Sequence, residues 1–158
     1  MRKLRSGLAV LVVIILAAGV AVLFYQYRQT EQTEQARTDA VAAASAQATA
    51  MLAYDFGGVD QQLASASDGL TGDFKDEYTK LVTDVIAPAA KEKSLTVQVT
   101  VQGTSVVSAE PDAATVLLFL NQITTSSDAP DAASSGSRVR MNMEKIDGRW
   151  LASNLEPI

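Results

Sequence analysis

The sequence predicts an α+β protein, in which an N-terminal transmembrane helix is followed by helices packed on a curved, four-stranded antiparallel sheet. Three observations lead to this class. A long apolar run stands near the N-terminus, apolar residues recur with a helical period as far as about residue 93, and from Leu95 the period changes to two. Helices that come first and strands that follow are typical of domains whose helices cover one sheet face.

The apolar run covers residues 8–25 and contains no charge, amide or proline. At helical rise this length crosses most of the hydrocarbon of a bilayer. Arg2, Lys3 and Arg5 precede the run, so the positive-inside rule places a basic stub, residues 1–7, in the cytoplasm. We therefore expect a single-pass protein of the plasma membrane whose C-terminal domain is extracytoplasmic.

A cleaved signal peptide is the alternative for this segment, because the basic stub fits one and Gly19-Val20-Ala21 offers a cleavage site. The apolar run continues past that site, however. Phe24, Tyr25 and Tyr27 also resemble the aromatic belt at a membrane interface. These features favour an uncleaved anchor.

Composition excludes several functions. All 18 acidic residues lie beyond the anchor, whereas Arg2, Lys3, Arg5 and Arg28 account for four of the 13 basic residues, which leaves a formal charge of −9 outside. Such a surface repels phosphates, so we exclude nucleic-acid binding. The chain has no cysteine and no histidine, which excludes disulfides, thiolate nucleophiles, the usual zinc sites and imidazole catalysis.

A membrane-proximal helix is expected over residues 26–55, because this stretch contains neither glycine nor proline. Residues 56–158 form the remainder of the domain. The apolar stripe of this helix consists of Val41, Ala44, Ala48 and Leu52, with Met51 beside it. We expect the stripe to pack in the core, and a stalk or coiled coil with a partner is the alternative.

Further helices follow Gly57-Gly58. A short helix is expected over 59–66, and a longer one has Asp73 as its N-cap. Pro88 predicts a kink or a division into two helices. The apolar face of the longer helix consists of Phe74, Tyr78, Leu81, Val82 and Val85. The acidic residues at its start lack the spacing of a calcium loop, so no metal site is predicted.

The strands begin at Leu95, from which valines alternate with polar residues, and Gly103 permits a bulge. Residues 115–123 are apolar on both faces, which predicts a central strand. Residues 124–137 carry no large apolar side chain and are expected to form a mobile loop. Val139, Met141 and Met143 then alternate with polar residues, and Asp147-Gly148 predicts a hairpin before the last strand, 150–155.

Several segments in this order resemble a known family. They are Tyr54-Asp55-Phe56, Leu70-Thr71-Gly72-Asp73-Phe74, Tyr78, Pro88, Val116-Leu117-Leu118-Phe119-Leu120-Asn121-Gln122 and Asp147-Gly148-Arg149-Trp150. Taken together, their order and spacing resemble the actinobacterial Mce-associated membrane proteins over nearly the whole chain. The resemblance implies a cone-shaped outer domain like that of nuclear-transport-factor-like proteins. It also implies an accessory role beside Mce-type lipid or sterol importers, and no catalytic residues.

One pair of side chains is a candidate for acid/base chemistry. Asp55 beside Tyr54, with Tyr78 on a later helix, would form a general acid/base pair if both groups faced a dry pocket. The structural interpretation is that Asp55 caps the turn at Gly57 while the tyrosines pack in the core. We favour the structural interpretation because no third group orients the pair.

Two further residues are candidates for a pocket or an interface. Asn121 ends an apolar strand and could hydrogen-bond a ligand, although buried amides usually satisfy nearby backbone groups. Trp150 is expected to seal the sheet against the helices, whereas an exposed Trp150 would indicate a partner contact.

The sequence thus predicts a non-enzymatic envelope protein without cofactor or metal, which contacts subunits of an Mce-type lipid-transport assembly or further copies of itself. The alternatives are a small-ligand carrier or enzyme that uses the interior of the cone, and a scaffold subunit of a secretion machine. A cone filled by Leu118, Phe119, Met141 and Trp150 would argue against an interior ligand.

Overall fold

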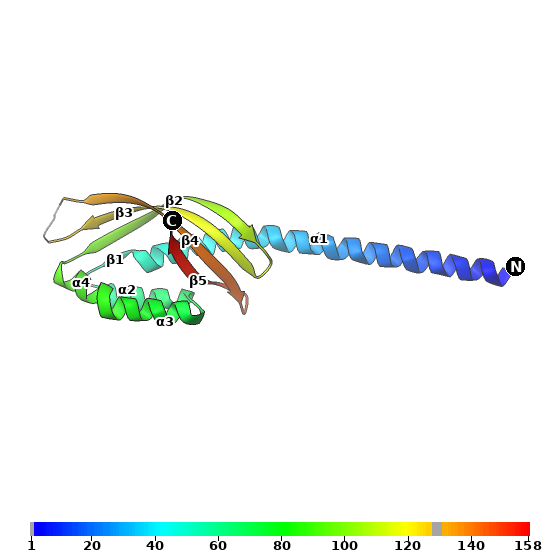
Figure 1. The fold of residues 1–158 in the computed structure, drawn as a ribbon, viewed down its shortest axis with the longest axis horizontal. Helices are drawn as coiled ribbons and strands as arrows, with labels where there is room; N and C mark the ends of the chain where they lie inside the picture. Colours follow the sequence, from blue (N-terminus) through cyan, green and yellow to red (C-terminus); the bar gives the residue numbers. More distant parts are fainter. Residues whose placement is uncertain (1, 128–130) are drawn as a thin grey trace.

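The computed structural model describes residues 2–127 and 131–158, and within the first helix the side chains of residues 2–18, 21–23 and 26 lie outside the description. The elements are α1 (Arg2–Leu52), β1 (Tyr54–Asp55), α2 (Val59–Ala66), a 3₁₀ turn η1 (Ser67–Gly69), α3 (Gly72–Leu81), a π-helical turn η2 (Val82–Ile86), α4 (Ala87–Glu92), β2 (Thr96–Ala109), β3 (Ala113–Thr125), β4 (Ala133–Ile146) and β5 (Arg149–Pro157). The sheet arches over the helices, and α1 projects far beyond the domain at its N-terminal end (Figure 1).

Helix α1 is continuous over 51 residues, so the expected helix that leads into the domain is confirmed, although it ends at Leu52. Where the structure describes side chains, no helix has a run long and apolar enough to cross a membrane. The predicted anchor, residues 8–25, falls mostly outside that part of the chain and stays a prediction.

The sheet has five antiparallel strands in the order β1-β2-β3-β4-β5, not the four that the sequence predicts. The additional strand is β1, whose Tyr54 lies opposite Val97 and whose Asp55 lies opposite Thr96. Two residues cannot display a period of two, so no sequence pattern indicates this strand. The expected central strand is confirmed, because β3 stands in the middle of the order.

The prediction of a long loop over residues 124–137 is wrong, because β3 extends to Thr125 and β4 begins at Ala133. Ser134 lies opposite Ile123, and Gly136 lies opposite Asn121. A ladder is made by backbone groups, so small residues can continue it once the apolar part of the strand fixes the register. Residues 128–130 of the predicted loop lie outside the described residues.

The core lies between the inner sheet face, α1 and the shorter helices. Its buried residues include Val116, Leu118 and Leu120 of β3, Val139, Met141 and Met143 of β4, Ala40, Ala44 and Ala48 of α1, and Val59 and Leu63 of α2. The predicted stripe on α1 is confirmed in part. Ala44, Ala48 and the neighbouring Met51 are buried, whereas Val41 and Leu52 are half-buried. The buried face continues from Ala44 to Ala40 and Ala36 instead. Alanines spaced by four let the helix approach the sheet closely, and larger residues occupy its flanks.

The outer face of β3 is not buried. Phe119 is 40% exposed and Ile123 is 36% exposed, although the strand is apolar on both faces. The described helices α2, α3 and α4 lie together on the other side of the sheet (Figure 1). The outer face of the central strand therefore remains available to solvent or to another molecule.

The predicted break at Pro88 is confirmed. Pro88 stands at the start of α4, directly after the π-helical turn η2. Proline lacks an N–H and crowds the carbonyl four residues before it, and a wider turn relieves that conflict. The predicted cap is wrong: Thr71 precedes the first residue of α3, Gly72 has φ of +60°, and Asp73 lies in the first turn.

Candidate functional site

The candidate acid/base group, Asp55 beside Tyr54 with Tyr78 on α3, has its polar atoms engaged elsewhere: the Tyr78 hydroxyl and both Asp55 oxygens have other partners. Tyr78 is 5% exposed, and its hydroxyl donates to the backbone carbonyl of Met51 at 3.1 Å. Burial raises the pKa of the Tyr78 phenol far above its ordinary value of 10.0. Burial also raises the pKa of Tyr54, which is half-buried on β1. Both phenols are therefore weaker acids than an exposed tyrosine.

Asp55 is exposed and uses both carboxylate oxygens in local structure. Its Oδ1 accepts from the N–H of Gly57 at 2.9 Å, and its Oδ2 accepts from the Thr96 hydroxyl at 2.8 Å. The first contact closes the turn after β1, and the second fastens β1 to β2. The Asp55 N–H donates to Gln62 Oε1 at 2.9 Å, which adds α2 to the same junction. This arrangement supports the structural role of Asp55.

Asn121 is half-buried on β3, and its Oδ1 accepts from the Ser134 hydroxyl at 3.0 Å. It lines an open hollow of ≈ 770 Å³ at the place where β5 ends beside β4. The other side chains at this hollow include Gln102, Phe119, Arg138 and Ile158. Asn121 thus faces a wide surface depression that can receive part of another molecule.

Trp150 is half-buried on β5 and packs against the core, as predicted. The ammonium of Lys145 lies 5.7 Å from the centroid of its ring, within the range of a cation–π contact. Its indole Nε1 is buried and has no hydrogen-bond partner among the described residues. Leu118 and Met141 do fill the interior, whereas Phe119 stands outside it.

Two smaller hollows lie on other faces. One, of ≈ 410 Å³, is a groove between α2 and the helices that follow it, and the ion pair of Lys91 with Asp60 borders it. The other, of ≈ 500 Å³, lies beside β1 and is lined by Tyr54 and Asp55. In the described part of the chain, no three carboxylates cluster as metal ligands.

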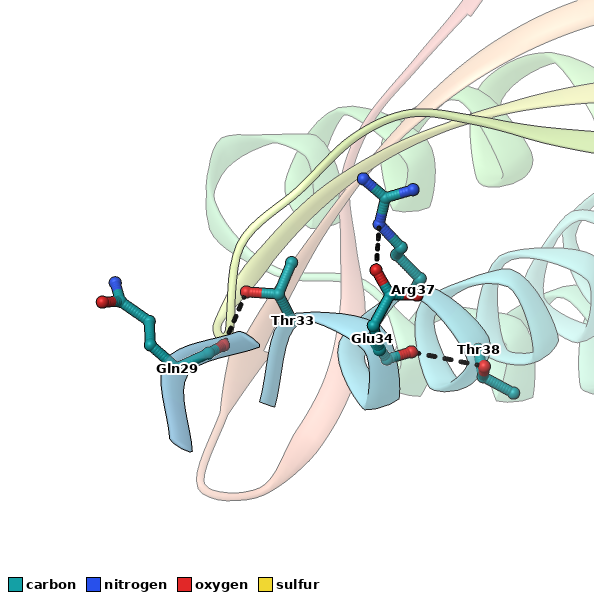
Figure 2. A network of polar contacts seen from close by, with 5 residues as sticks. All are labelled: Gln29, Thr33, Glu34, Arg37 and Thr38. Carbon is teal, nitrogen blue, oxygen red and sulfur yellow. Dashed lines mark hydrogen bonds and ion pairs between the residues drawn. The ribbon is translucent and has the colours of Figure 1, made fainter. Parts of the chain in front are cut away.

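A polar neck joins the N-terminal part of α1 to the domain, at residues for which the sequence predicted no functional role. The neck, residues 28–35, repeats Gln-Thr-Glu, and nearly all its side chains are exposed. Figure 2 shows its end at the domain, where the Thr33 hydroxyl donates to the Gln29 carbonyl at 3.0 Å and Arg37 lies 3.6 Å from Glu34. Ala36 follows at once and is buried. A helix that is polar on all sides is typical of a solvated connection between two bodies.

The neck is short. At helical rise its eight residues span roughly 12 Å. Pro111 and Asp112 of the β2–β3 turn and Lys145 of β4 line a small hollow with Gln32 and Gln35 of the neck. The β2–β3 turn and the end of β4 therefore lie beside α1 at the point where this helix enters the domain.

Comparison with known proteins identifies a family for this chain and solved structures with the same fold. The model of a family described as "Uncharacterized protein Rv1363c/MT1408-like" matches residues 2–158. "Outer membrane protein Rv1973" of Mycobacterium tuberculosis is 40% identical over 158 residues, which cover 99% of this chain and 98% of that protein.

Solved structures share the fold at low identity. An IcmL-like type IV secretion system protein of Legionella pneumophila superposes with a TM-score of 0.63 at 13% identity, covering 74% of this chain and 89% of that one. A putative aromatic ring hydroxylase of Novosphingobium aromaticivorans superposes with a TM-score of 0.54 at 13% identity, covering 77% and 94%. The predicted class, helices on a curled antiparallel sheet, is confirmed.

Proposed function

The chain belongs to the Rv1363c/MT1408-like family, and we propose that it is a non-enzymatic, single-pass envelope protein whose outer domain acts through contacts with other proteins. In the finer form of the proposal it is an accessory subunit that stabilises or connects an Mce-type lipid or sterol importer. The N-terminus is cytoplasmic and the α+β domain is extracytoplasmic.

One observation carries the proposal. Helix α1 runs without interruption from the basic stub and the apolar run, through the polar neck, into the core of the domain. A short, rigid neck of this kind holds a domain close to a membrane surface and fixes its orientation there. The name of a relative that is 40% identical, an outer membrane protein, supports a place in the cell envelope.

The non-enzymatic part of the proposal rests on how the polar side chains are used. The hydroxyl of Tyr78 is bound to Met51, and both oxygens of Asp55 are bound to groups of the β1 turn and β2. The fold alone does not decide whether a protein is an enzyme, because a secretion-system protein and a putative hydroxylase both have this fold. The Mce-type partner rests on the order of the motifs from Tyr54 to Trp150.

Crosslinking in intact membranes tests the proposal. The tagged full-length protein is crosslinked, purified in detergent, and its co-purifying proteins are identified. Recovery of lipid-importer subunits supports the finer proposal. Recovery of secretion subunits contradicts the Mce-type partner but still supports a function in protein–protein contacts. Recovery of the protein alone with a bound small molecule would contradict both, and would move attention to the interior of the cone.

A further inference from the structure

One edge of the sheet is open. At this edge the outermost strand is the two-residue β1, which pairs with β2 only at Thr96 and Val97. The rest of β2 therefore forms the edge. Over residues 98–109, none of the described residues bonds to the backbone groups that point away from β3. An edge of this kind presents a row of unpaired N–H and C=O groups, which is a template for another strand.

The chemistry of this edge differs from that of the opposite edge. Strand β2 contains no charged residue and no proline over its 14 residues, and Val107 is 60% exposed. Strand β5, at the other edge, carries Arg149, Glu156 and Pro157. Charges and proline are the usual protection of a sheet edge against unwanted pairing. The domain therefore protects one edge and leaves the other free of charge, although its surface is otherwise acidic.

Two bulges shape the open edge. They lie between Val101 and Gly103 and between Val106 and Ser108. Each bulge inserts one residue, which keeps valines such as Val101 and Val106 on the side of the core. Residues 98–101, before the first bulge, and residues 103–106, between the two bulges, pair regularly with β3. These two stretches offer the best geometry for a further strand.

We propose that the β2 edge receives an extended segment of a different protein as an added strand. This inference rests on the proposed function in protein–protein contacts, and it specifies the contact surface and the chemistry of the partner segment. The segment is uncharged, lacks proline, and alternates β-branched or other apolar residues on the core side with threonine-like or glutamine-like residues outside, as β2 itself does. Backbone hydrogen bonds supply affinity, and the alternation supplies register.

A second copy of this chain does not fit the edge. Antiparallel pairing of β2 with its own copy in one continuous sheet requires a two-fold axis perpendicular to the sheet. Strand β2 and helix α1 both run along the length of the molecule (Figure 1), so this axis would point the two α1 helices in opposite directions. Two chains anchored in one membrane from the same side cannot adopt that arrangement.

Amide hydrogen exchange of the full-length protein in detergent micelles tests the added strand. The probe is a synthetic peptide that alternates valine and threonine over the length of β2 and has lysine at both ends. At a concentration ten times its Kd, we expect exchange of outward amides within 98–106 to slow by about tenfold. The same peptide, N-methylated at every residue between its terminal lysines, should give no slowing, because neither of its edges can donate to the ladder.

A matched pair of variants completes the test. Gln102→Lys places a charge at the first bulge, where the side chain is exposed, and should abolish the slowing. Gln61→Lys makes the same exchange on an exposed position of α2 and should preserve it. Slowing by both peptides, or by neither, would overturn the proposal, as would concentration-dependent protection of β2 without any peptide, which would indicate a second copy.

The cellular form of the test uses the absence of cysteine. A photoreactive group on Ser105→Cys, an exposed position of β2, should join an uncharged segment of another protein in intact membranes, whereas the same group on Gln61→Cys should not. An adduct of two copies of this chain, or no adduct at Ser105→Cys, would contradict the inference. The exchange experiment needs no membrane assembly, so its failure is distinguishable from failure of the proposed function.

Discussion

The hydroxyl of Tyr78 on α3 donates a hydrogen bond of 3.1 Å to the backbone carbonyl of Met51, in the last turn of α1. The last four carbonyls of a helix have no partner within the helix. A side chain 27 positions later in the sequence therefore completes the end of the long helix. This bond joins the part of the chain that leaves the domain to the helices that cover the sheet.

Replacement of Tyr78 by phenylalanine should lower the free energy of unfolding of the domain by about 1 kcal/mol, because a buried carbonyl loses its partner. Urea unfolding of the detergent-solubilised protein, followed by Trp150 fluorescence, measures the change. Tyr54→Phe is the matched control, because the Tyr54 hydroxyl makes no hydrogen bond to another described residue. Equal effects of the two substitutions would contradict a specific role for the Tyr78 bond.

Alkaline pH should destabilise the domain through the same residue. The pKa of Tyr78 is raised in the folded state, so above pH 10 the unfolded chain loses its phenolic proton while the folded chain keeps it. Stability contributed by this group is complete below pH 10 and falls above it, by about 1.4 kcal/mol per pH unit. Urea titrations between pH 9 and about 11 should show this decline, and it should shrink in Tyr78→Phe.

Substitution Ala44→Leu should destabilise the domain by about 1–3 kcal/mol, because Ala44 is fully buried where α1 approaches the sheet. Ala46→Leu places the same side chain on the exposed face of α1 and should change stability by less than about 0.5 kcal/mol. Thermal unfolding of both variants provides the comparison. A tolerated leucine at position 44 would mean that the close approach of helix and sheet is not required.

Substitution Asp55→Asn should leave the recovery of partner proteins near that of the natural chain, because an amide oxygen can still accept from the Gly57 N–H. Asp55→Ala removes both bonds and should cost about 1 kcal/mol in stability without abolishing contacts. Co-purification from membranes and urea unfolding measure the two properties separately. A large loss of function in Asp55→Asn with an intact fold would support the enzymatic alternative.

A membrane-impermeant maleimide should label Ser135→Cys in intact cells, because residue 135 is exposed on β4 and the domain is proposed to lie outside. Ser6→Cys, in the basic stub, should react only after the cells are permeabilised. The chain has no cysteine of its own, so each variant reports one position. The opposite pattern of labelling would overturn the proposed topology.

The sequence by itself determined the class of the fold and most of its elements. Helical and alternating periods are properties of neighbouring residues, so they predicted α2, the alternation of β2 and β4, and the hairpin at Asp147-Gly148. Breaks at Gly57 and Pro88 followed from backbone chemistry that does not depend on distant contacts. The structural role of Asp55 beside Gly57 was also a local inference, and its contacts support it.

Tertiary structure decided the features that depend on which segments meet. Strand β1 exists because two residues after α1 reach Val97, and residues 133–137 are a strand because β3 lies beside them. The buried face of α1 includes Ala36 and Ala40, in place of the predicted Val41, because the sheet approaches from one direction. The open edge of β2 is likewise a property of strand order alone. Pairing and approach are set by the whole chain, and a local pattern does not contain them.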